Sequence, residues 1–460
     1  MDVAEVVTRA RAAQAQVSDW GAERVGELTT AVAYAVARKE RAEELARLAV
    51  DEAGFGNYAD KVTKIERRVL GVLSDLREIK TVGVVEEDPE RGLVKIAKPV
   101  GVVAGLVPTT GPDATPPVKA LCALAGRNAI IFAAHPRSKL TTDAVVGYMR
   151  EACEQVGAPA DLVQVLPEAK IAFTQELMRL ADLIVATGGS AMVKAAYSSG
   201  TPAFGVGVGN SVHVVDETAD LPDAASAIAA GKTFDYATSC LADNSVVAHE
   251  DIYGELLARL RALGGHLCSP AEKARLQAVM WPEGEEIPSP GVIAKSALRI
   301  AGLAAIDVPE ATTFLIVEED GVGHDHPFSG EKLSVVLALY RYAGGISAAV
   351  DRVNDITGYQ GLGHTCGIHT TEQAHIDALA FGTRTARVLV NQNLNEGAGS
   401  ARNGLPFTLS LSCGTWGGGI MTENVNARHF VNLTWVSRPI PAKAIDADRL
   451  FAGHFEKYGR

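Results

Sequence analysis

With 460 residues, the chain exceeds the usual size of one hydrophobic core, so we expect two or more domains. Hydrophobic residues make up 47% and charged residues 21%, as in soluble globular proteins, and a net charge of -12 argues against a nucleic-acid-binding surface. No apolar run approaches the roughly 20 residues of a membrane helix, and the N-terminal stretch has no apolar signal core. We therefore expect a cytoplasmic protein with neither a nucleic acid nor a membrane as its partner.

The predicted elements change character along the chain. Residues 1 to about 85 are predicted to be helical, because apolar residues recur there at every third or fourth position. From about residue 93, short strands such as "NAIIFAA" alternate with helices such as "TTDAVVGYMREACEQVG", which indicates βαβ units and a parallel sheet. A second alternating block begins near residue 231, and "RHFVNLTWVSRPI" lies outside both blocks. We predict an α/β fold with domains at 1–230 and 231–425, and a β arm at 426–460 that pairs with another subunit.

Cys240 ends the stretch "GKTFDYATSC" and precedes an apolar run that is predicted to be a strand. A nucleophile would stand at the mouth of such a strand, whereas a structural thiol would more naturally lie inside it. Because a free thiol has a pKa of about 8.5, a reactive Cys240 would need a helix N-terminus or nearby donors to become a thiolate. The alternative is an inert buried thiol, which we expect for most of the 6 cysteines, since none has metal-ligand spacing.

Several other segments contain residue types suited to catalysis or binding. Gly188 and Gly189 join a predicted strand to a helix N-terminus, whose free N–H groups can hold a phosphate, although the same glycines could form only a tight turn. His364 in "QGLGHTCGIHT" could be a base or a proton relay, and Cys366 beside it is a rival nucleophile. Glu331 precedes a strand, where its carboxylate could accept sugar hydroxyls or face solvent. The spacing of His, Cys and acidic residues predicts no metal site.

Taken in order, these segments resemble the CoA-acylating aldehyde dehydrogenases. The matching stretches are "GVVAGLVPTTGPDATPPVKAL", "GRNAIIFAAHPRSK", "ATGGSAMVKAAYSSGTPAFGVGVGN", "VDETAD", "KTFDYATSC", "GEKLSVVLALY", "GLGHT" and "CGTWGGG". The resemblance implies two Rossmann-like α/β/α domains, one for NAD or NADP and one for the cysteine, and a β arm that builds a homodimer or homotetramer. It implies an aldehyde and coenzyme A as the other small-molecule partners.

The same resemblance gives roles to single residues. Cys240 would be the nucleophile, and His364 would lie close to the acyl-transfer step. The residues that it assigns to the nicotinamide dinucleotide are His135, Pro136, Arg137, Gly188, Gly189 and Glu331. The first three would face the adenosine ribose, the glycines would line the dinucleotide site, and the glutamate would hold the nicotinamide ribose.

The implied reaction passes through a cysteine thioester. The Cys240 thiolate adds to an aldehyde, the adduct loses a hydride to NAD(P)+, and CoA collects the acyl group. Hydrolytic relatives place a glutamate base where this chain has "GVGVG", with Val206 near the corresponding position, so CoA is favoured over water. The alternatives are a hydrolytic dehydrogenase that releases a free acid and a low-activity dinucleotide-binding homologue.

The expected substrate site departs from the family pattern. Gly111 stands where the family usually has an asparagine that donates to the oxyanion, and loss of such a donor costs on the order of a hundredfold in rate. The Thr110 hydroxyl or backbone N–H groups would replace it, or a larger substrate would use the space. Asp113 would not help, because a nearby carboxylate raises a thiol pKa. Gly419 likewise replaces a frequent asparagine.

The substrate itself is weakly determined. The C-terminal segments resemble the sulfoacetaldehyde-type branch, and an anionic aldehyde would need a cation. Arg402 in "GAGSARNGLPF" is the candidate, and its alternative is an exposed loop arginine. Acetaldehyde, glycolaldehyde and succinate semialdehyde stay open. We therefore place Thr110, Gly111 and Arg402 in the predicted substrate site.

Overall fold

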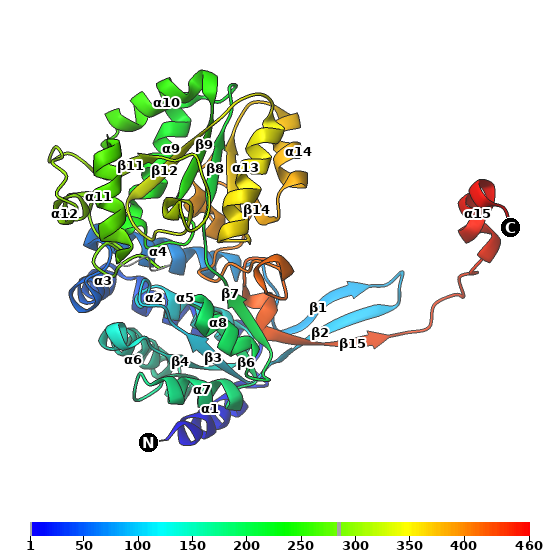
Figure 1. Ribbon diagram of the computed structural model, residues 1–460. Coiled ribbons are helices and arrows are strands. Elements are labelled where there is room, and N and C mark those ends of the chain that lie inside the picture. Colours follow the sequence, from blue (N-terminus) through cyan, green and yellow to red (C-terminus); the bar gives the residue numbers. More distant parts are fainter. Residues whose placement is uncertain (1, 283–286) are drawn as a thin grey trace.

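The computed structural model describes residues 2–282 and 287–460, which form an α/β body and a long β arm (Figure 1). The body has two parallel sheets, each covered by helices, and each sheet lies over its own hydrophobic core. The predicted α/β class with two Rossmann-like halves agrees with this architecture. In the described residues, no helix is both long and apolar enough to cross a membrane.

The first sheet has the strand order β5-β4-β3-β6-β7, and every pairing is parallel. Its strands are β3 (Val102–Leu106), β4 (Ala129–Ala133), β5 (Val163–Val165), β6 (Leu183–Thr187) and β7 (Ala203–Val206). The helices around it are α1 (Val3–Val17), α2 (Ala22–Ala37), α3 (Lys39–Ala53), α4 (Tyr58–Asp75), α5 (Thr115–Ala125), α6 (Lys139–Gln155), α7 (Ile171–Leu180) and α8 (Ser190–Tyr197). All five residues of β3 and of β4 are buried, as continuous apolar runs require when helices cover both faces.

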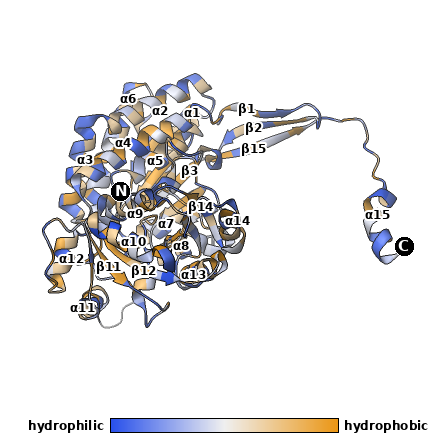
Figure 2. Cartoon of the chain, turned by 90° about the horizontal axis from the view of Figure 1, so that it is seen from above, coloured by the Kyte–Doolittle hydropathy of each residue, from blue (hydrophilic) through white to orange (hydrophobic). Residues whose placement is uncertain are grey.

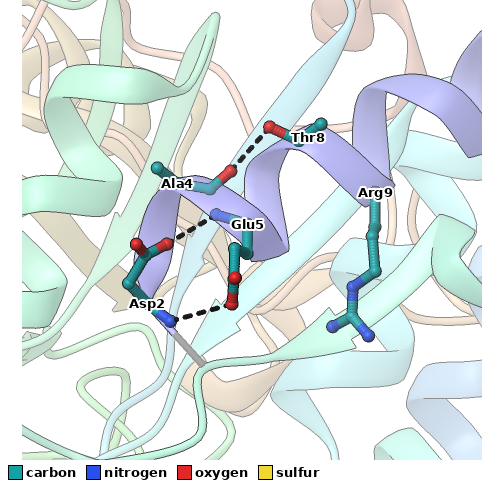
Figure 3. Close-up of a pocket in the computed structure, with 5 residues that line it drawn as sticks. All are labelled: Asp2, Ala4, Glu5, Thr8 and Arg9. Atoms are coloured by element: carbon teal, nitrogen blue, oxygen red, sulfur yellow. Dashed lines mark hydrogen bonds between the residues drawn. The ribbon is translucent and has the colours of Figure 1, made fainter.

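The first helix shows how local sequence fixes an element boundary (Figure 3). The Asp2 carboxylate accepts the Glu5 N–H at 2.8 Å, and the Glu5 carboxylate accepts the Asp2 N–H at 3.3 Å. This capping box satisfies two helix donors that would otherwise lack partners. Farther along the same helix, Arg9 donates to the Gln164 side chain at 2.9 Å, which ties α1 to β5.

The second sheet has the order β10-β11-β12-β9-β8-β13-β14, and it is also parallel throughout. Its strands are β8 (Val212–Val215), β9 (Ser245–His249), β10 (Gly265–Leu267), β11 (Phe314–Glu318), β12 (Val336–Tyr342), β13 (Gly363–His369) and β14 (Thr385–Val390). Its helices are α9 (Leu221–Thr233), α10 (Glu250–Ala262), α11 (Pro270–Met280), α12 (Ala297–Leu303), α13 (Ile346–Tyr359) and α14 (Gln373–Gly382).

The change from the first sheet to the second comes earlier than the boundary predicted at residue 230. The chain leaves the first sheet after Val206 and enters the second at Val212, and α9 packs into the second core. Strand–helix alternation continues unbroken through this region. The alternation predicts the elements correctly, but it carries no information about which sheet a strand joins.

The β arm is made of three antiparallel strands from both ends of the chain. It combines β1 (Gly83–Asp88), β2 (Leu93–Pro99) and β15 (Val431–Ser437), with β2 in the middle. The arm and the final helix α15 (Ala447–Tyr458) stand clear of the body in both views (Figures 1 and 2). Leu433 and Trp435 are exposed on the arm, and so are Leu450 and Phe451 on α15.

Candidate active site

Cys240 lies at the start of the second domain, between the short 3-10 helix Phe234–Ala237 and β9. It is partly exposed, and its carbonyl oxygen accepts the Ser211 hydroxyl at 3.1 Å. A Cβ on Gly209 would lie 2.3 Å from the Cys240 carbonyl oxygen and 2.6 Å from the Cys240 Cβ. Position 209 therefore has to be a glycine for the cysteine to pack where it does.

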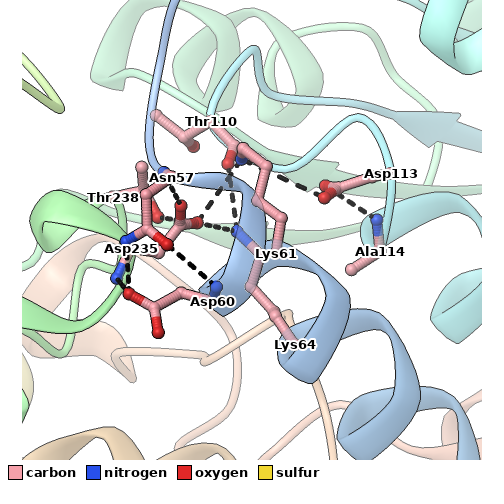
Figure 4. A network of polar contacts seen from close by, with 9 residues as sticks. All are labelled: Asn57, Asp60, Lys61, Lys64, Thr110, Asp113, Ala114, Asp235 and Thr238. Carbon is pink, nitrogen blue, oxygen red and sulfur yellow. Dashed lines mark hydrogen bonds and ion pairs between the residues drawn. The ribbon is translucent and has the colours of Figure 1, made fainter. Parts of the chain in front are cut away.

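The turn before Cys240 is strained. Asp235, Tyr236 and Ala237 have φ values of 49°, 50° and 60°, so three successive residues with side chains occupy the left-handed region. Each costs about 1–2 kcal/mol relative to a right-handed conformation, so surrounding contacts must hold the turn. Figure 4 shows such contacts around Asp235, which is completely buried.

Glu331 is hydrogen-bonded to Gly209, the same glycine that packs against Cys240. Its carboxylate accepts the Gly209 N–H at 3.0 Å, and its own N–H donates to the Gln360 side chain at 2.9 Å. Burial raises the pKa of Glu331 to about 8. Burial also raises the pKa of the Cys240 thiol to about 12, and the charge of Glu331 adds to this effect. Without ligands the thiol is protonated at neutral pH, so its reaction needs a proton acceptor.

His364 is a histidine that shares the charged neighbour Arg387 with Cys240. It lies on β13 and is completely buried, and neither ring nitrogen has a hydrogen-bond partner among the described residues. Burial, and then the charge of Arg387, lower the pKa of His364 to about 3. The imidazole is therefore neutral throughout the physiological range, and with a pKa this low it is a weak base in the ligand-free protein.

Arg387 was not predicted from the sequence, because it lies within the ordinary strand pattern of "ARVLV". It is buried on β14 opposite Thr365, and its guanidinium donates to the Ser412 carbonyl at 3.0 and 2.6 Å. Its charge acts on His364, Cys240 and Cys413, so it lies among all three. The structure thus places the buried thiol of Cys413 and the guanidinium of Arg387 near Cys240.

Val206 also lies beside Cys240. It belongs to a small apolar cluster that Cys240 packs against, together with Leu241, Ala398 and Leu411. The position near which hydrolytic relatives would have a glutamate base is therefore occupied here by a buried hydrocarbon side chain. The Val206 side chain cannot accept a proton from a water molecule next to the thiol.

Five of the six predicted dinucleotide residues lie at the carboxyl edge of the first sheet, and the sixth, Glu331, lies beside Gly209. His135 and Arg137 follow β4, and the His135 ring accepts the Arg137 N–H at 3.1 Å. Gly188 and Gly189 follow β6, and Gly189 is the N-cap of α8. A Cβ on Gly189 would have no atom within 4 Å, so this helix start is open to a ligand. The sheet order reverses between β3 and β6, which is where parallel α/β sheets bind dinucleotides.

The Thr110–Gly111 loop follows β3 at the same edge. The Gly111 N–H already donates to the Pro108 carbonyl at 3.3 Å, so it is engaged in the turn. A Cβ on Gly111 would lie 2.9 Å from the Thr115 hydroxyl oxygen. The buried hydroxyl of Thr109, which the sequence did not single out, has no partner among the described residues and is therefore available as a donor.

Arg402 lies on an exposed loop. Its N–H donates to the Ser400 hydroxyl at 2.9 Å. This geometry fits the alternative of a loop arginine in the ligand-free chain. A role with an anionic substrate stays a prediction.

Two groups outside this site place acids near a histidine. Asp216 bonds the His375 ring at 2.6 Å, with Glu217 beside them. Glu319 bonds the His326 ring at 2.7 Å, but Lys273 is 3.0 Å from the same carboxylate, so the acid is already neutralised. In each group one acid is hydrogen-bonded to the histidine.

Comparison with known proteins gives consistent results. Residues 1–267 match the model of the aldehyde dehydrogenase family. The acylating sulfoacetaldehyde dehydrogenase of Cupriavidus necator is 44% identical over 463 residues, covering 100% of this chain and 93% of that protein. The crystal structure of an acetylating aldehyde dehydrogenase from Geobacillus thermoglucosidasius has a TM-score of 0.92 at 35% identity and covers 96% of this chain and 98% of that one.

A third similarity concerns the chemistry. The propionaldehyde dehydrogenase of Rhodopseudomonas palustris, solved with bound CoA and an acylated cysteine, has a TM-score of 0.86 at 26% identity. The alignment covers 95% of this chain and 97% of that one.

Proposed function

The chain belongs to the aldehyde dehydrogenase family, and on that premise we propose that it interconverts a short aldehyde and CoA with an acyl-CoA through a thioester on Cys240. NAD or NADP is the hydride carrier, and its proposed contacts are those at the open N-terminus of α8 and at Glu331. The single observation that carries the proposal is the packing of Cys240 on Gly209, whose N–H holds Glu331. It sets the nucleophile beside a carboxylate suited to ribose hydroxyls.

The chain's residues account for each step. Cys240 adds its sulfur to the aldehyde carbon while its proton passes to a base, for which His364 is the proposed group because it shares the neighbour Arg387 with Cys240. NAD(P)+, when bound, accepts the hydride that leaves this carbon, so that an acyl thioester remains on Cys240. Once this base has released the Cys240 proton to solvent, the CoA thiol gives its own proton to it and attacks the thioester carbon. Acyl-CoA leaves, and Cys240 is released as a thiolate that takes up a proton.

The choice of CoA over water has a physical basis in Val206. Hydrolysis needs a base that removes a proton from water, and the side on which Cys240 packs against the cluster of Val206, Leu241 and Leu411 is apolar. CoA carries a thiol that is a far stronger nucleophile at neutral pH. This supports acyl transfer over the hydrolytic alternative.

For the substrate we propose sulfoacetaldehyde, with the smaller uncharged aldehydes as competitors. Support comes from the acylating sulfoacetaldehyde dehydrogenase that resembles this chain over its full length. Arg402 is the proposed cation for the sulfonate and would have to approach the aldehyde site when substrate binds. We also propose a cytoplasmic homodimer or homotetramer held by the β arm, because Leu433 and Trp435 are exposed on it.

The test is an NADH and NADPH absorbance assay with a panel of short aldehydes, with and without CoA. We expect CoA-dependent reduction of the nicotinamide and an acylated Cys240 peptide by mass spectrometry when CoA is left out. Cys240→Ala should abolish turnover and still bind NADH, whereas Cys153→Ala, which truncates a buried thiol on α6, should keep the activity. Full-rate acid formation without CoA would favour the hydrolytic alternative.

A further inference from the structure

A cluster of four buried charges lies behind the strained turn that precedes Cys240 (Figure 4). The Asp235 carboxylate accepts Lys64 at 2.5 Å, the Thr238 hydroxyl at 2.7 Å and Lys61 at 3.4 Å. The side chains of Asp235 and Lys61 are 0% and 1% exposed, and that of Lys64 is 10% exposed. Charges this deep are stable only when they are paired, so these contacts fix the position of the Asp235 carboxylate.

The start of α4 adds backbone contacts to the same turn. The Asn57 N–H donates to the Asp235 carboxylate at 3.0 Å, and the Asp235 N–H donates to Asp60 at 2.7 Å. A Cβ on Gly56 would lie 2.0 Å from the Asp235 carboxylate, so the backbone at Gly56 packs directly against this carboxylate. Hydrogen bonds to both the side chain and the backbone of Asp235 therefore hold this residue at its φ value of 49°.

The two lysines also reach a second segment of the active site. Lys64 donates to the Thr110 carbonyl at 3.3 Å, and Lys61 lies 4.0 Å from Asp113. The Asp113 carboxylate in turn accepts the Ala114 N–H at 3.0 Å, which fixes the loop before α5. The lysines of α4 therefore link the turn before Cys240 to the loop that contains Gly111.

The geometry points to a positioning role for this charge clamp, which we define as Lys61, Lys64, Asp113 and Asp235. The clamp holds the Cys240 turn and the Thr110–Gly111 loop at a fixed separation, so that the sulfur meets the aldehyde carbon while donors of the loop meet its oxygen. It touches no reacting atom. This inference rests on the proposed function, because it assumes that Cys240 is the nucleophile.

The clamp also explains how the chain can lack the usual asparagine. A loop whose own side-chain donor is missing depends more heavily on exact placement of the donors that remain, such as the free hydroxyl of Thr109. The two lysines and two aspartates pair their charges with one another, next to the carboxylate of Asp60. Their contribution is distance and orientation.

The test compares Asp235→Asn, which keeps the size of the side chain and removes its charge, with Asp161→Asn. Asp161 pairs with Arg150 at 2.9 Å on the far side of the first domain and is the matched control. For each variant we would measure the melting temperature, the NADH dissociation constant, kcat, both KM values and the iodoacetamide alkylation rate of the Cys240 peptide. The alkylation rate reports the nucleophile without any substrate.

We expect Asp235→Asn to lower kcat about a hundredfold and to change the Cys240 alkylation rate severalfold, with NADH binding and KM for CoA within about threefold of wild type. Asp161→Asn should match wild type. A folded Asp235→Asn enzyme with wild-type kcat and alkylation would overturn the inference.

If Asp235→Asn does not fold, the charge-neutral pair Lys61→Met with Asp113→Asn decides the question with the same measurements. Its contact is the longest of the clamp, so we expect a smaller loss of kcat, about tenfold, and wild-type values would overturn the inference. If wild-type enzyme shows no CoA-dependent turnover, the proposed function fails. The alkylation rates still report the clamp in that case.

Discussion

Gly209 packs so closely against Cys240 that even a small side chain at this position should impair catalysis. Substitution by alanine adds one methyl group, which would lie 2.3 Å from the Cys240 carbonyl oxygen, 2.6 Å from its Cβ and 2.9 Å from its carbonyl carbon. Two of these three atoms are backbone, so no side-chain rotation relieves the contact. The cysteine turn would have to retreat by about 1 Å to restore ordinary van der Waals distances.

Such a retreat has a calculable effect. Misplacement of a reacting group by about 1 Å costs on the order of a hundredfold in rate, which corresponds to about 2.7 kcal/mol of activation free energy. Overpacking of a filled site costs a further 1–3 kcal/mol or so in folding stability. We therefore expect Gly209→Ala to fold with a lowered melting temperature and a kcat at least about a hundredfold below wild type.

Gly207 provides the control within the same loop. A Cβ there would come no closer than 3.8 Å to any atom, so Gly207→Ala should keep kcat within about fivefold. The assay is CoA-dependent NADH formation at saturating substrates, with active sites counted by alkylation of Cys240. Equal kcat values for the two alanine variants would refute the argument that close backbone packing sets the nucleophile.

Two further predictions concern the carboxylate and the oxyanion loop. Because burial raises the pKa of Glu331 to about 8, its carboxyl is largely protonated below that pH and becomes charged above it. Ribose hydroxyls donate stronger hydrogen bonds to the charged carboxylate. The affinity for NADH should therefore rise between pH 7 and pH 9. Glu331→Gln should abolish this rise in fluorescence titrations, and an unchanged rise would assign it to another group. Gly111→Asn should raise kcat on acetaldehyde about tenfold or more if a missing donor limits the rate, once the Thr115 hydroxyl rotates away from the new side chain. No gain, together with a large loss in Thr109→Val, would identify the Thr109 hydroxyl as the donor that compensates.

The sequence predicted the local elements and the chemical types well. Alternation of short apolar strands with amphipathic helices predicted two parallel α/β sheets, and the motifs around Cys240, Glu331 and His364 predicted residues that the structure brings to one region. These features depend on residues close together in the chain. Local periodicity is enough to reveal the strands and helices, whereas the three site residues were indicated by the resemblance to the CoA-acylating aldehyde dehydrogenases.

Contacts between distant segments could not be predicted in this way. Arg387 lies in an unremarkable strand and joins the site only because β14 pairs with β13, and Lys61 and Lys64 face the cysteine turn only because α4 packs against it. The strand Val212–Val215 joins the second sheet although the pattern around it continues from the first.

The amino-acid sequence by itself therefore determined the kind of fold, the choice of Cys240 as the proposed nucleophile and the absence of a glutamate at position 206. The tertiary structure alone decided the charge state of the site: a thiol with a raised pKa, a glutamate whose pKa is about 8 and a histidine held neutral. The physical reason is that a pKa follows from burial and from neighbouring charges, and here both are supplied by segments far apart in the chain.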